Sequence, residues 1–348
     1  MRHELVATGR VDKKLPVQTL LKELLVDATR SLPLPVLIRE VRKRLPNRTT
    51  YAAFVLLVCV SAWYGFAPAG AVSPASSQTS VTATSARVQT VQFQSQLVGA
   101  SLPYNVVLPV GYDLPAARDK RYPVVYLLHG LFGHYDNWTS KTRLADYTAS
   151  HEVILVTPEG NNGWYTDSQL APKEQYESYI VKELIPDVDR RFRTISDRSG
   201  RAIAGLSMGG YGAIKFGFKY PAMFAFAGSM SGAMNAASWT REELAGLPSI
   251  WKSLQQVFGD DGTQTRQTND LPKRVRDMSS QEIAALPFIY LDCGTEDPLF
   301  PSNRSFAELL VSRRIPHEYR QRPGGHSWAY WDTQVQEVIK LAMKTMQK

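Results

Sequence analysis

The sequence is poor in the residues that build disulfides and metal sites. Its 348 residues include only 2 cysteines and 6 histidines. Cys59 and Cys293 both stand in apolar stretches, which predicts two unpaired thiols rather than a disulfide. The sequence contains no H-E-x-x-H motif, no paired C-x-x-C and no cluster of close histidines, so we predict no bound metal. A P-loop and a strand followed by G-x-G-x-x-G are also missing, so no cofactor is predicted.

Most of the chain also lacks an excess of charge of either sign. The formal net charge is +8, but residues 1–48 contain 11 Lys and Arg against 5 Asp and Glu. The remaining 300 residues contain 29 against 27. Since the body of the protein is nearly neutral, its charge predicts no nucleic-acid partner.

No charged residue occurs between Thr49 and Ala86, and this gap has the pattern of an export signal. Basic residues 42–44 precede an apolar run over residues 51–67, and "AGA" follows it. The run is also near the lower length limit for a membrane span. Residues 49–71 therefore predict a signal peptide or a membrane anchor, with the body exported (periplasmic or secreted) or anchored outside the cytoplasm.

The segments on both sides of this run are not expected to belong to the folded body. Residues 1–48 form a basic extension too long for an ordinary signal-peptide start, and we interpret it as a mis-assigned translation start. Residues 72–87 are rich in Ser, Thr and Ala without apolar periodicity, which predicts a disordered linker. The folded domain is expected over residues 88–348.

Within this domain, predicted strands alternate with predicted helices. Two antiparallel edge strands are expected in "VQTVQFQSQLVG" and "LPYNVVLPVGY". Apolar runs typical of strands buried on both faces follow in "YPVVYLLHG", "HEVILVTPEG", "GRAIAGLS", "FAFAGSMSG" and "FIYLDCG". Helical stretches separate them, which predicts an α/β fold with a mostly parallel central sheet flanked by helices. Residues 233–286 interrupt this alternation, and we expect a helical, loop-rich insertion above the carboxyl ends of the strands.

The stretch "IAGLSMGGYG" places Ser207 between a predicted strand and a predicted helix. A G-x-S-x-G sequence in that context is typical of a nucleophile elbow, in which a sharp turn exposes the serine hydroxyl. The start of a helix also favours negative charge that develops nearby. We therefore predict that Ser207 is a catalytic nucleophile.

A serine nucleophile needs a base, usually a histidine held by a carboxylate. In this chain order the base follows the serine, which leaves His317 and His326. His317 begins a predicted strand, where a structural role is typical, whereas His326 lies in the glycine-rich loop "RPGGHSW" and can reach the serine. We predict that His326 is the base.

The carboxylate is expected in the loop after a core strand, between the serine and the histidine. "FIYLDCGTEDPLF" contains Asp292 within the strand, and Glu296 and Asp297 at its carboxyl end. We favour Asp297 over Glu296. The oxyanion hole is expected to use the backbone N–H groups of Met208, which follows the nucleophile, and of Leu131 in "HGLFGHYDNW".

Five stretches in this order carry a family resemblance: "LLHGLFGHYDNW", "PEGNNGWYTDS", "AGLSMGGYGA", "LDCGTEDPL" and "PGGHSWAYW". Residues 88–345 resemble the esterase branch of the α/β-hydrolases that includes S-formylglutathione hydrolases, feruloyl and acetyl-xylan esterase modules, and secreted mycolyltransferases. The resemblance implies the α/β-hydrolase fold and assigns the triad to Ser207, Asp297 and His326. Mycolyltransferases usually have Asp-Gly where this chain has His129-Gly130, and their acid is a glutamate, so the resemblance does not extend to mycolyl transfer.

The leading functional prediction is an exported serine carboxylesterase that acts on a small-molecule or glycan-linked ester through an acyl-enzyme. The alternatives are an acyltransferase that passes the acyl group to a sugar or another alcohol, and a catalytically silent binding protein of the cell envelope. Five aromatic residues are candidates to line the substrate pocket, and a role as aromatic core is the alternative for each: Trp138, Trp164, Tyr165, Trp328 and Tyr330.

Overall fold

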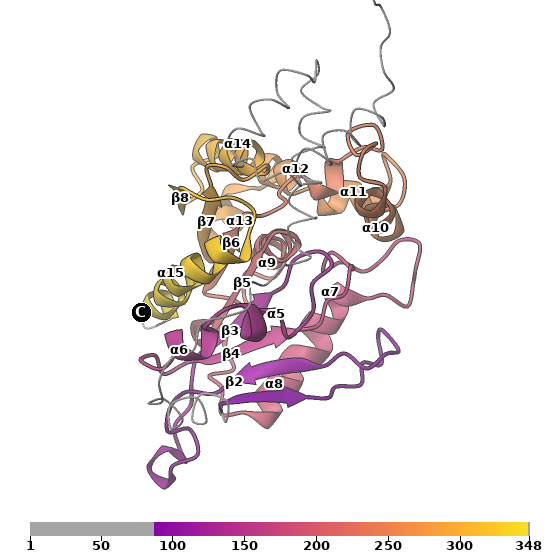
Figure 1. Ribbon diagram of the computed structural model, residues 1–348. Helices are drawn as coiled ribbons and strands as arrows, with labels where there is room; N and C mark the ends of the chain where they lie inside the picture. Colours follow the sequence, from indigo (N-terminus) through magenta and orange to yellow (C-terminus); the bar gives the residue numbers. More distant parts are fainter. Residues whose placement is uncertain (1–86, 347–348) are drawn as a thin grey trace, which may run out of the picture. The chain divides into compact units, whose positions relative to one another are not determined.

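The computed structural model describes residues 87–346 (Figure 1). The predicted basic extension, the signal or anchor segment and nearly all of the linker lie outside the described residues. Within residues 87–346, no helix is both long enough and apolar enough to cross a membrane.

Eight strands form one sheet, and its order is β1-β2-β4-β3-β5-β6-β7-β8. The pairs β1–β2 and β2–β4 are antiparallel, and all later neighbours are parallel. The predicted α/β fold with a mostly parallel sheet is thus confirmed. The strands are β1 (Val88–Val91), β2 (Tyr104–Val107), β3 (Val124–Leu128), β4 (Ile154–Pro158), β5 (Arg201–Leu206), β6 (Phe226–Met230), β7 (Phe288–Gly294) and β8 (His317–Arg322).

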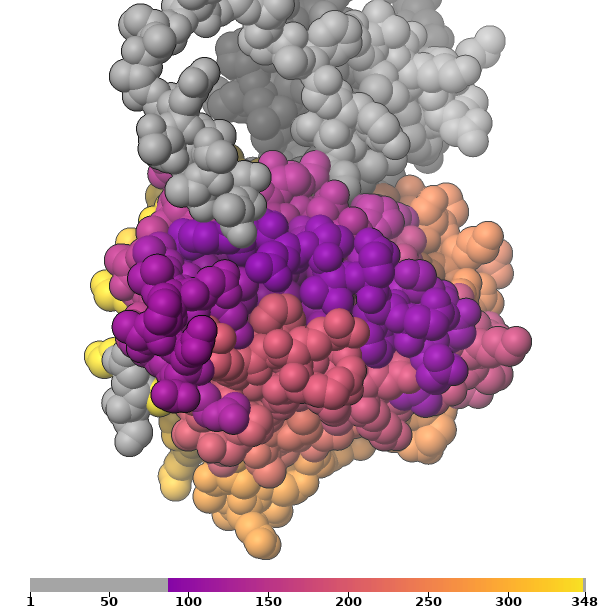
Figure 2. All heavy atoms as spheres, turned by 90° about the horizontal axis from the view of Figure 1, so that it is seen from below, coloured from indigo at the N-terminus to yellow at the C-terminus, as the bar shows by residue number. Residues whose placement is uncertain are grey.

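The antiparallel pair β1–β2 forms one edge of the sheet, and β8 forms the other (Figure 1). Figure 2 shows the molecule from below, where the indigo and violet residues of the first strands spread across the surface. This arrangement confirms the two antiparallel edge strands expected from the alternating pattern at the start of the domain.

Helices cover both faces of the sheet because the central strands are apolar on both sides. The helices are α5 (Asn137–Lys141), α6 (Leu144–Tyr147), α7 (Tyr176–Tyr179), α8 (Ile185–Arg191), α9 (Met208–Lys219), α10 (Pro248–Phe258), α11 (Gln264–Asn269), α12 (Leu271–Asp277), α13 (Ser280–Ala285), α14 (Phe300–Ser312) and α15 (Trp328–Met346). Ile203 packs in one core with residues of α9, whereas its neighbours Ala202 and Ala204 pack in the other with residues of α15. Each large apolar side chain buried in this way contributes about 1.5–3 kcal/mol to folding.

The helical segment over residues 176–191 contains a local irregularity. A π-helical turn, Ile180–Leu184, connects α7 to α8. Pro186 follows within the first turn of α8. Proline has no backbone N–H and its ring clashes with the carbonyl four residues earlier, so a wider turn accommodates it inside a continuous helix.

The insertion, residues 233–286, connects β6 to β7 and contains α10 to α13. Buried Arg266 binds its segments together: its side chain donates to the carbonyl oxygens of Gly259, Ala237 and Trp239. Its guanidinium also lies 5.1 Å from the centre of the Trp251 ring. The insertion is therefore an ordered part of the domain, and three of its residues, Ala233, Trp239 and Ile250, line the pocket at Ser207.

Candidate active site

Ser207 lies at the sharp turn between β5 and α9, with φ of 54° and ψ of −117°. A non-glycine residue rarely adopts a positive φ, and such strain is concentrated at functional positions. The glycines on both sides permit the close crossing of strand and helix. A Cβ on Gly205 would lie 2.5 Å from the Gly209 carbonyl oxygen, and one on Gly209 would lie 2.4 Å from the Leu128 oxygen. The G-x-S-x-G pattern is thus explained by backbone contact.

His326 lies in the loop between β8 and α15, and its imidazole faces Ser207. The distance from His326 Nε2 to Ser207 Oγ is 3.0 Å, a hydrogen bond. The imidazole and the Trp331 ring pack edge to face, with 4.8 Å between ring centres and 87° between ring planes. Trp331 therefore limits how the histidine ring can turn, and the sequence analysis did not identify it.

Asp297 lies just after β7 and binds the other side of the same ring. Its Oδ2 lies 2.9 Å from His326 Nδ1, and its Oδ1 accepts the backbone N–H of Leu299 at 2.8 Å. Asp297 is 3% exposed. A hydroxyl, an imidazole and a buried carboxylate thus form one continuous chain of hydrogen bonds.

The two alternatives considered from the sequence lie elsewhere. The carboxylate of Glu296 accepts the N–H of Gly324 and the hydroxyl of Thr295, rather than a bond from His326. His317 Nδ1 lies 2.8 Å from the carbonyl oxygen of Ile315, at the start of β8. Glu296 thus binds the backbone of the loop that carries His326, and His317 binds backbone two residues before itself, which agrees with the preference for Asp297 and His326.

The two predicted oxyanion donors have free backbone N–H groups close to Ser207. Met208 is the first residue of α9, where the N–H has no acceptor within the helix. Leu131 precedes Phe132, whose N–H donates to Asn162 Oδ1 at 2.8 Å. Within residues 87–346, no such acceptor serves the N–H of Leu131. Leu131 and Ser207 line the same pocket.

The loop that carries Leu131 is held by a buried pair, His129 and Glu159. His129 Nδ1 lies 2.8 Å from the Gly130 oxygen, and its Nε2 lies 2.9 Å from Gly160 N. The Glu159 carboxylate lies 3.3 Å from His129 Nε2 and accepts the N–H of Asn161 at 2.7 Å. Burial opposes ionisation of Glu159, but His129 and the backbone donors outweigh it and lower the pKa of Glu159 to about 2. His129 thus has a structural role in this loop.

The pocket at Ser207 is small and mostly apolar, with a volume of about 110 Å³. Of the five aromatic candidates, Trp164 lines it. The sequence analysis missed eight apolar lining residues: Phe132, Leu206, Ala233, Trp239, Ile250, Pro298, Leu299 and Trp331. The alternation of strands and helices does not reveal which side chains of a loop or an insertion point toward one atom.

The other four aromatic candidates are not among the residues that line this pocket. Trp138 is fully buried and donates to the Leu128 oxygen, and Tyr165 donates to the His129 oxygen. Trp328 packs edge to face on Trp138. Tyr330 is buried and donates to Asp292 Oδ1 at 3.0 Å. Three of these side chains thus donate hydrogen bonds to residues in or directly after the strands β3 and β7, which lead into loops of the site.

Asp292 lies within β7 and is fully buried. Its Oδ2 has no hydrogen-bond partner in the described part of the chain. Burial raises the pKa of the Asp292 carboxyl to about 7, although the hydrogen bond from Tyr330 opposes the shift. We therefore expect this group to change its protonation near neutral pH, although it is not among the residues that line the pocket at Ser207.

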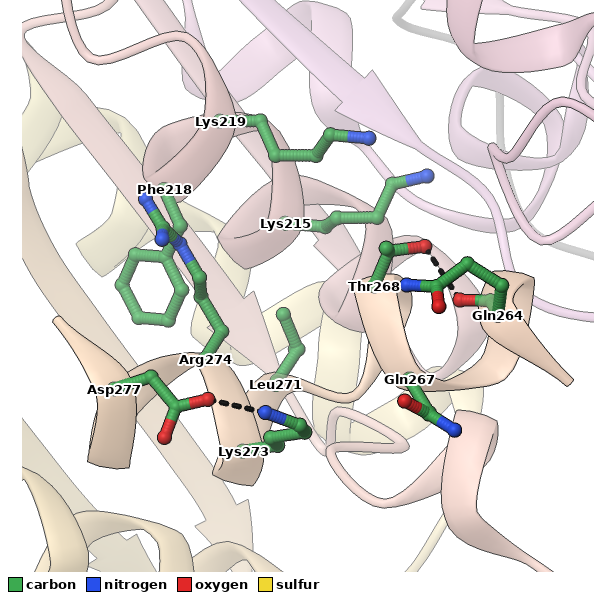
Figure 3. Close-up of a pocket in the computed structure, with 10 residues that line it drawn as sticks. All are labelled: Lys215, Phe218, Lys219, Gln264, Gln267, Thr268, Leu271, Lys273, Arg274 and Asp277. Atoms are coloured by element: carbon green, nitrogen blue, oxygen red, sulfur yellow. Dashed lines mark hydrogen bonds and ion pairs between the residues drawn. The ribbon is translucent and has the colours of Figure 1, made fainter. Parts of the chain in front are cut away.

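A roomier cavity of about 480 Å³ lies between α9 and the helices α11 and α12 (Figure 3). Its cationic side chains each have a carboxylate partner: Lys215 and Lys219 pair with Glu177, Lys273 with Asp277, and Arg274 with Glu282. None of Ser207, Asp297 and His326 lines it. Within residues 87–346, no group of three or more His, Cys, Asp or Glu side chains is arranged to hold a metal ion.

Comparisons with known proteins agree on one family. Residues 95–340 match the family described as "Putative esterase". An esterase of Mycobacterium tuberculosis is 33% identical over 256 residues, which cover 68% of this chain and 54% of the relative. This chain thus spans about half the length of that relative. An acetyl esterase of Caldicellulosiruptor saccharolyticus is 27% identical over 270 residues, which cover 74% of this chain and 98% of the relative.

Solved structures give the same result for the fold. A ferulic acid esterase superimposes with a TM-score of 0.62 at 27% identity, covering 74% of this chain and 98% of the other. An S-formylglutathione hydrolase from Staphylococcus aureus gives 0.61 at 25% identity with the same coverage. The two are named for different substrates, so the likeness by itself selects no ester.

Proposed function

This chain belongs to the esterase family that its residues 95–340 match, and from that premise we propose that it is a serine carboxylesterase. The observation that carries the proposal is the chain of hydrogen bonds from Asp297 through His326 to Ser207, with distances of 2.9 and 3.0 Å. The family relation alone would be compatible with a protein that has lost its catalytic groups. The continuous arrangement of all three groups supports an active enzyme.

In the proposed reaction, Ser207 Oγ attacks the carbonyl carbon of an ester while His326 Nε2 accepts the hydroxyl proton. Asp297 accepts the Nδ1–H of the histidine and stabilises the imidazolium that forms. The negative charge on the former carbonyl oxygen is stabilised by the N–H groups of Leu131 and Met208, each worth a factor of roughly 10²–10³ in rate.

Collapse of this intermediate expels the alcohol, which takes the proton from His326, and leaves an acyl group on Ser207. A water molecule, deprotonated by His326, then attacks the acyl-enzyme and releases the acid. Hydrolysis is the reaction proposed, because the matching family is described as an esterase and a relative is named an acetyl esterase.

The dimensions of the pocket support a short, apolar acyl group. Pockets that enclose drug-sized ligands measure about 300–1,000 Å³. The pocket at Ser207 measures about 110 Å³ and is lined by aliphatic and aromatic side chains around Ser207 and His326. Acetyl and similarly short acyl groups therefore suit it better than long chains.

A fluorophosphonate probe tests this function, because it forms a covalent bond only with an activated serine. The folded protein should be labelled and should hydrolyse p-nitrophenyl acetate, and Ser207→Ala should abolish both. Absence of labelling in the folded wild-type protein would contradict the proposal.

We also propose that the domain acts outside the cytoplasm, on the basis of the basic cluster and the apolar run over residues 51–67. N-terminal sequencing of the mature protein tests cleavage near residue 71. A mature protein that starts upstream of residue 60 would contradict a cleaved signal.

A further inference from the structure

The loop between β4 and α7 contains two consecutive aromatic residues in the left-handed conformation. Trp164 and Tyr165 both have φ of 50°, and both side chains are buried. Bulky residues rarely adopt this conformation, and they keep it only where the surrounding structure imposes it. The contacts of the two residues identify the groups that do so.

Lys215, on α9, binds the carbonyl end of this aromatic pair. Its Nζ donates to the Tyr165 oxygen and to Thr166 Oγ1, at 2.6 Å each. Its third donor binds Glu177 Oε2 at 2.7 Å, so all three donors of the ammonium have acceptors. Within residues 87–346, no backbone N–H donates to the Tyr165 oxygen. Lys215 therefore provides the partner that this buried carbonyl needs.

The hydroxyl of Thr166 extends the same contact to Trp164. It accepts from Lys215 Nζ and donates to the Trp164 oxygen at 2.9 Å. One ammonium and one hydroxyl thus bind the carbonyl oxygens of both left-handed residues.

The Tyr165 side chain is held independently of Lys215. Its hydroxyl donates to the His129 oxygen at 3.1 Å. Its ring also lies against two glycines: a Cβ on Gly160 would lie 2.5 Å from it, and a Cβ on Gly212 would lie 2.7 Å from it. If Lys215 released the Tyr165 carbonyl, the freedom gained would therefore fall mainly on Trp164.

Trp164 lines the pocket at Ser207 and contacts a second lining residue. Its ring packs edge to face on Trp239, with 6.3 Å between ring centres and 84° between ring planes. Trp239 lines the same pocket, whose volume is only about 110 Å³. In so small a pocket, a displaced indole changes which acyl chains can enter.

The carboxylate that pairs with Lys215 has a second lysine partner. Lys215 and Lys219 bind the two oxygens of Glu177 at 2.7 Å each, and Figure 3 shows their side chains extending from α9 in the same direction. The Tyr220 hydroxyl also donates to Glu177. Glu177 therefore keeps a counter-charge when Lys215 is replaced, and Lys219 shares the carboxylate without the bonds to Tyr165 and Thr166.

We infer that Lys215 is a positioning residue that determines acyl-chain specificity, because it holds Trp164 where the indole closes the pocket at Ser207 to long acyl groups. The inference rests on the proposed esterase function. Lys215 is not among the residues that line this pocket, so it acts through the loop that carries Trp164.

The test compares p-nitrophenyl acetate with p-nitrophenyl hexanoate, which differ only in the length of the acyl chain. The wild-type protein should favour the acetate in kcat/KM. Lys215→Met should lower the acetate-to-hexanoate ratio of kcat/KM about tenfold, mainly through a lower KM for the hexanoate. Both esters are measured on the same sample, so a smaller folded fraction does not change this ratio.

Lys219→Met is the matched control, because it removes the other lysine of Glu177 and no bond to the loop. It should leave the ratio unchanged. Thr166→Val removes the hydroxyl between Lys215 and the Trp164 oxygen, while the buried ammonium keeps Glu177. It should lower the ratio in the same direction, about threefold, and it decides the question if Lys215→Met does not fold.

An unchanged ratio in Lys215→Met, or in Thr166→Val if the lysine variant does not fold, would overturn the inference. An equal change in Lys219→Met would also overturn it, since the effect would then belong to Glu177. A wild type without a preference for the acetate would do the same.

Fluorophosphonate labelling and turnover of p-nitrophenyl acetate report the proposed function separately. If the wild type shows both and the ratio is unchanged in the variants, only the positioning role of Lys215 is rejected. If the folded wild type shows neither, the esterase proposal is rejected together with this inference.

Discussion

Glu296 and Gly324 are joined by two hydrogen bonds that connect the loop of Asp297 to the loop of His326. The N–H of Gly324 donates to the Glu296 carboxylate, and the N–H of Glu296 donates to the Gly324 carbonyl oxygen at 3.0 Å. Glu296 precedes Asp297, and Gly324 lies two residues before His326. The pair therefore fixes the separation of the two loops that meet in the Asp297–His326 hydrogen bond.

We predict that Glu296→Ala lowers kcat about tenfold with little change in KM, because the loop loses one hydrogen bond and the histidine is less well positioned. Glu296→Gln retains an acceptor oxygen and should recover most of the loss. Asp297→Asn should lower kcat about 10⁴-fold, since an amide cannot hold the imidazole in the required tautomer. Steady-state hydrolysis of p-nitrophenyl acetate measures all three, and equal losses in Glu296→Ala and Asp297→Asn would assign the acid to Glu296.

A second prediction concerns Glu177 and Lys215, which are buried together. Lys215 Nζ donates to the Tyr165 oxygen, to Thr166 Oγ1 and to Glu177 Oε2 at 2.6, 2.6 and 2.7 Å. Burial lowers the pKa of Lys215 to about 8, although the carboxylate opposes the shift. Glu177→Gln leaves the buried ammonium without its counter-charge and should lower the free energy of unfolding by about 3–5 kcal/mol.

Urea denaturation at neutral pH measures this loss. Lys219→Met is the matched control, because Lys219 pairs with the same carboxylate from a partly exposed position. It should cost no more than about 1 kcal/mol. Similar losses in the two variants would show that the buried ammonium does not depend on Glu177.

A third prediction concerns the dependence of stability on pH. The pKa of Asp292 rises from 3.8 to about 7 on folding. Between these values the folded state keeps a proton that the unfolded state releases. The stabilising contribution is therefore complete below the unfolded pKa and is lost as the pH rises through the folded pKa. The free energy of unfolding should fall by up to ~1.4 kcal/mol per pH unit across this range, apart from other groups.

Asp292→Asn isolates this contribution because an amide does not titrate. Urea denaturation of both proteins between about pH 5 and pH 8 should show the Asn variant gaining stability relative to the wild type as the pH rises. An identical pH dependence of the two proteins would exclude a titration of Asp292 in this range.

The sequence predicted the elements whose residues are determined by burial and by chain order. Runs such as "YPVVYLLHG" are apolar because both faces of β3 are covered, so the strand could be located without a structure. Ser207, Asp297 and His326 could be proposed because each follows the carboxyl end of a parallel strand, and these ends lie on the same side of the sheet. Their mutual geometry comes from the sheet, which is why local sequence was sufficient to propose them.

The sequence did not reveal the π-helical turn at residues 180–184 or the lining of the pocket at Ser207. Trp331 contacts His326 while Trp328, one helical turn earlier, packs on Trp138 instead. Which of two tryptophans reaches the site depends on the rotation of α15 about its own axis. Trp239 and Ile250 were missed because a segment without strand periodicity gives no indication of where its side chains point.

The connection from β6 to β7 is far longer than the sheet requires. Parallel neighbours need a crossover of roughly a dozen residues, whereas here the chain runs from the end of β6 at Met230 to the start of β7 at Phe288. The sheet constrains the two ends of this connection but not its length or composition. Evolution can therefore shorten, extend or exchange this one continuous segment, and so alter which esters are accepted, while the residues proposed to perform the chemistry stay unchanged.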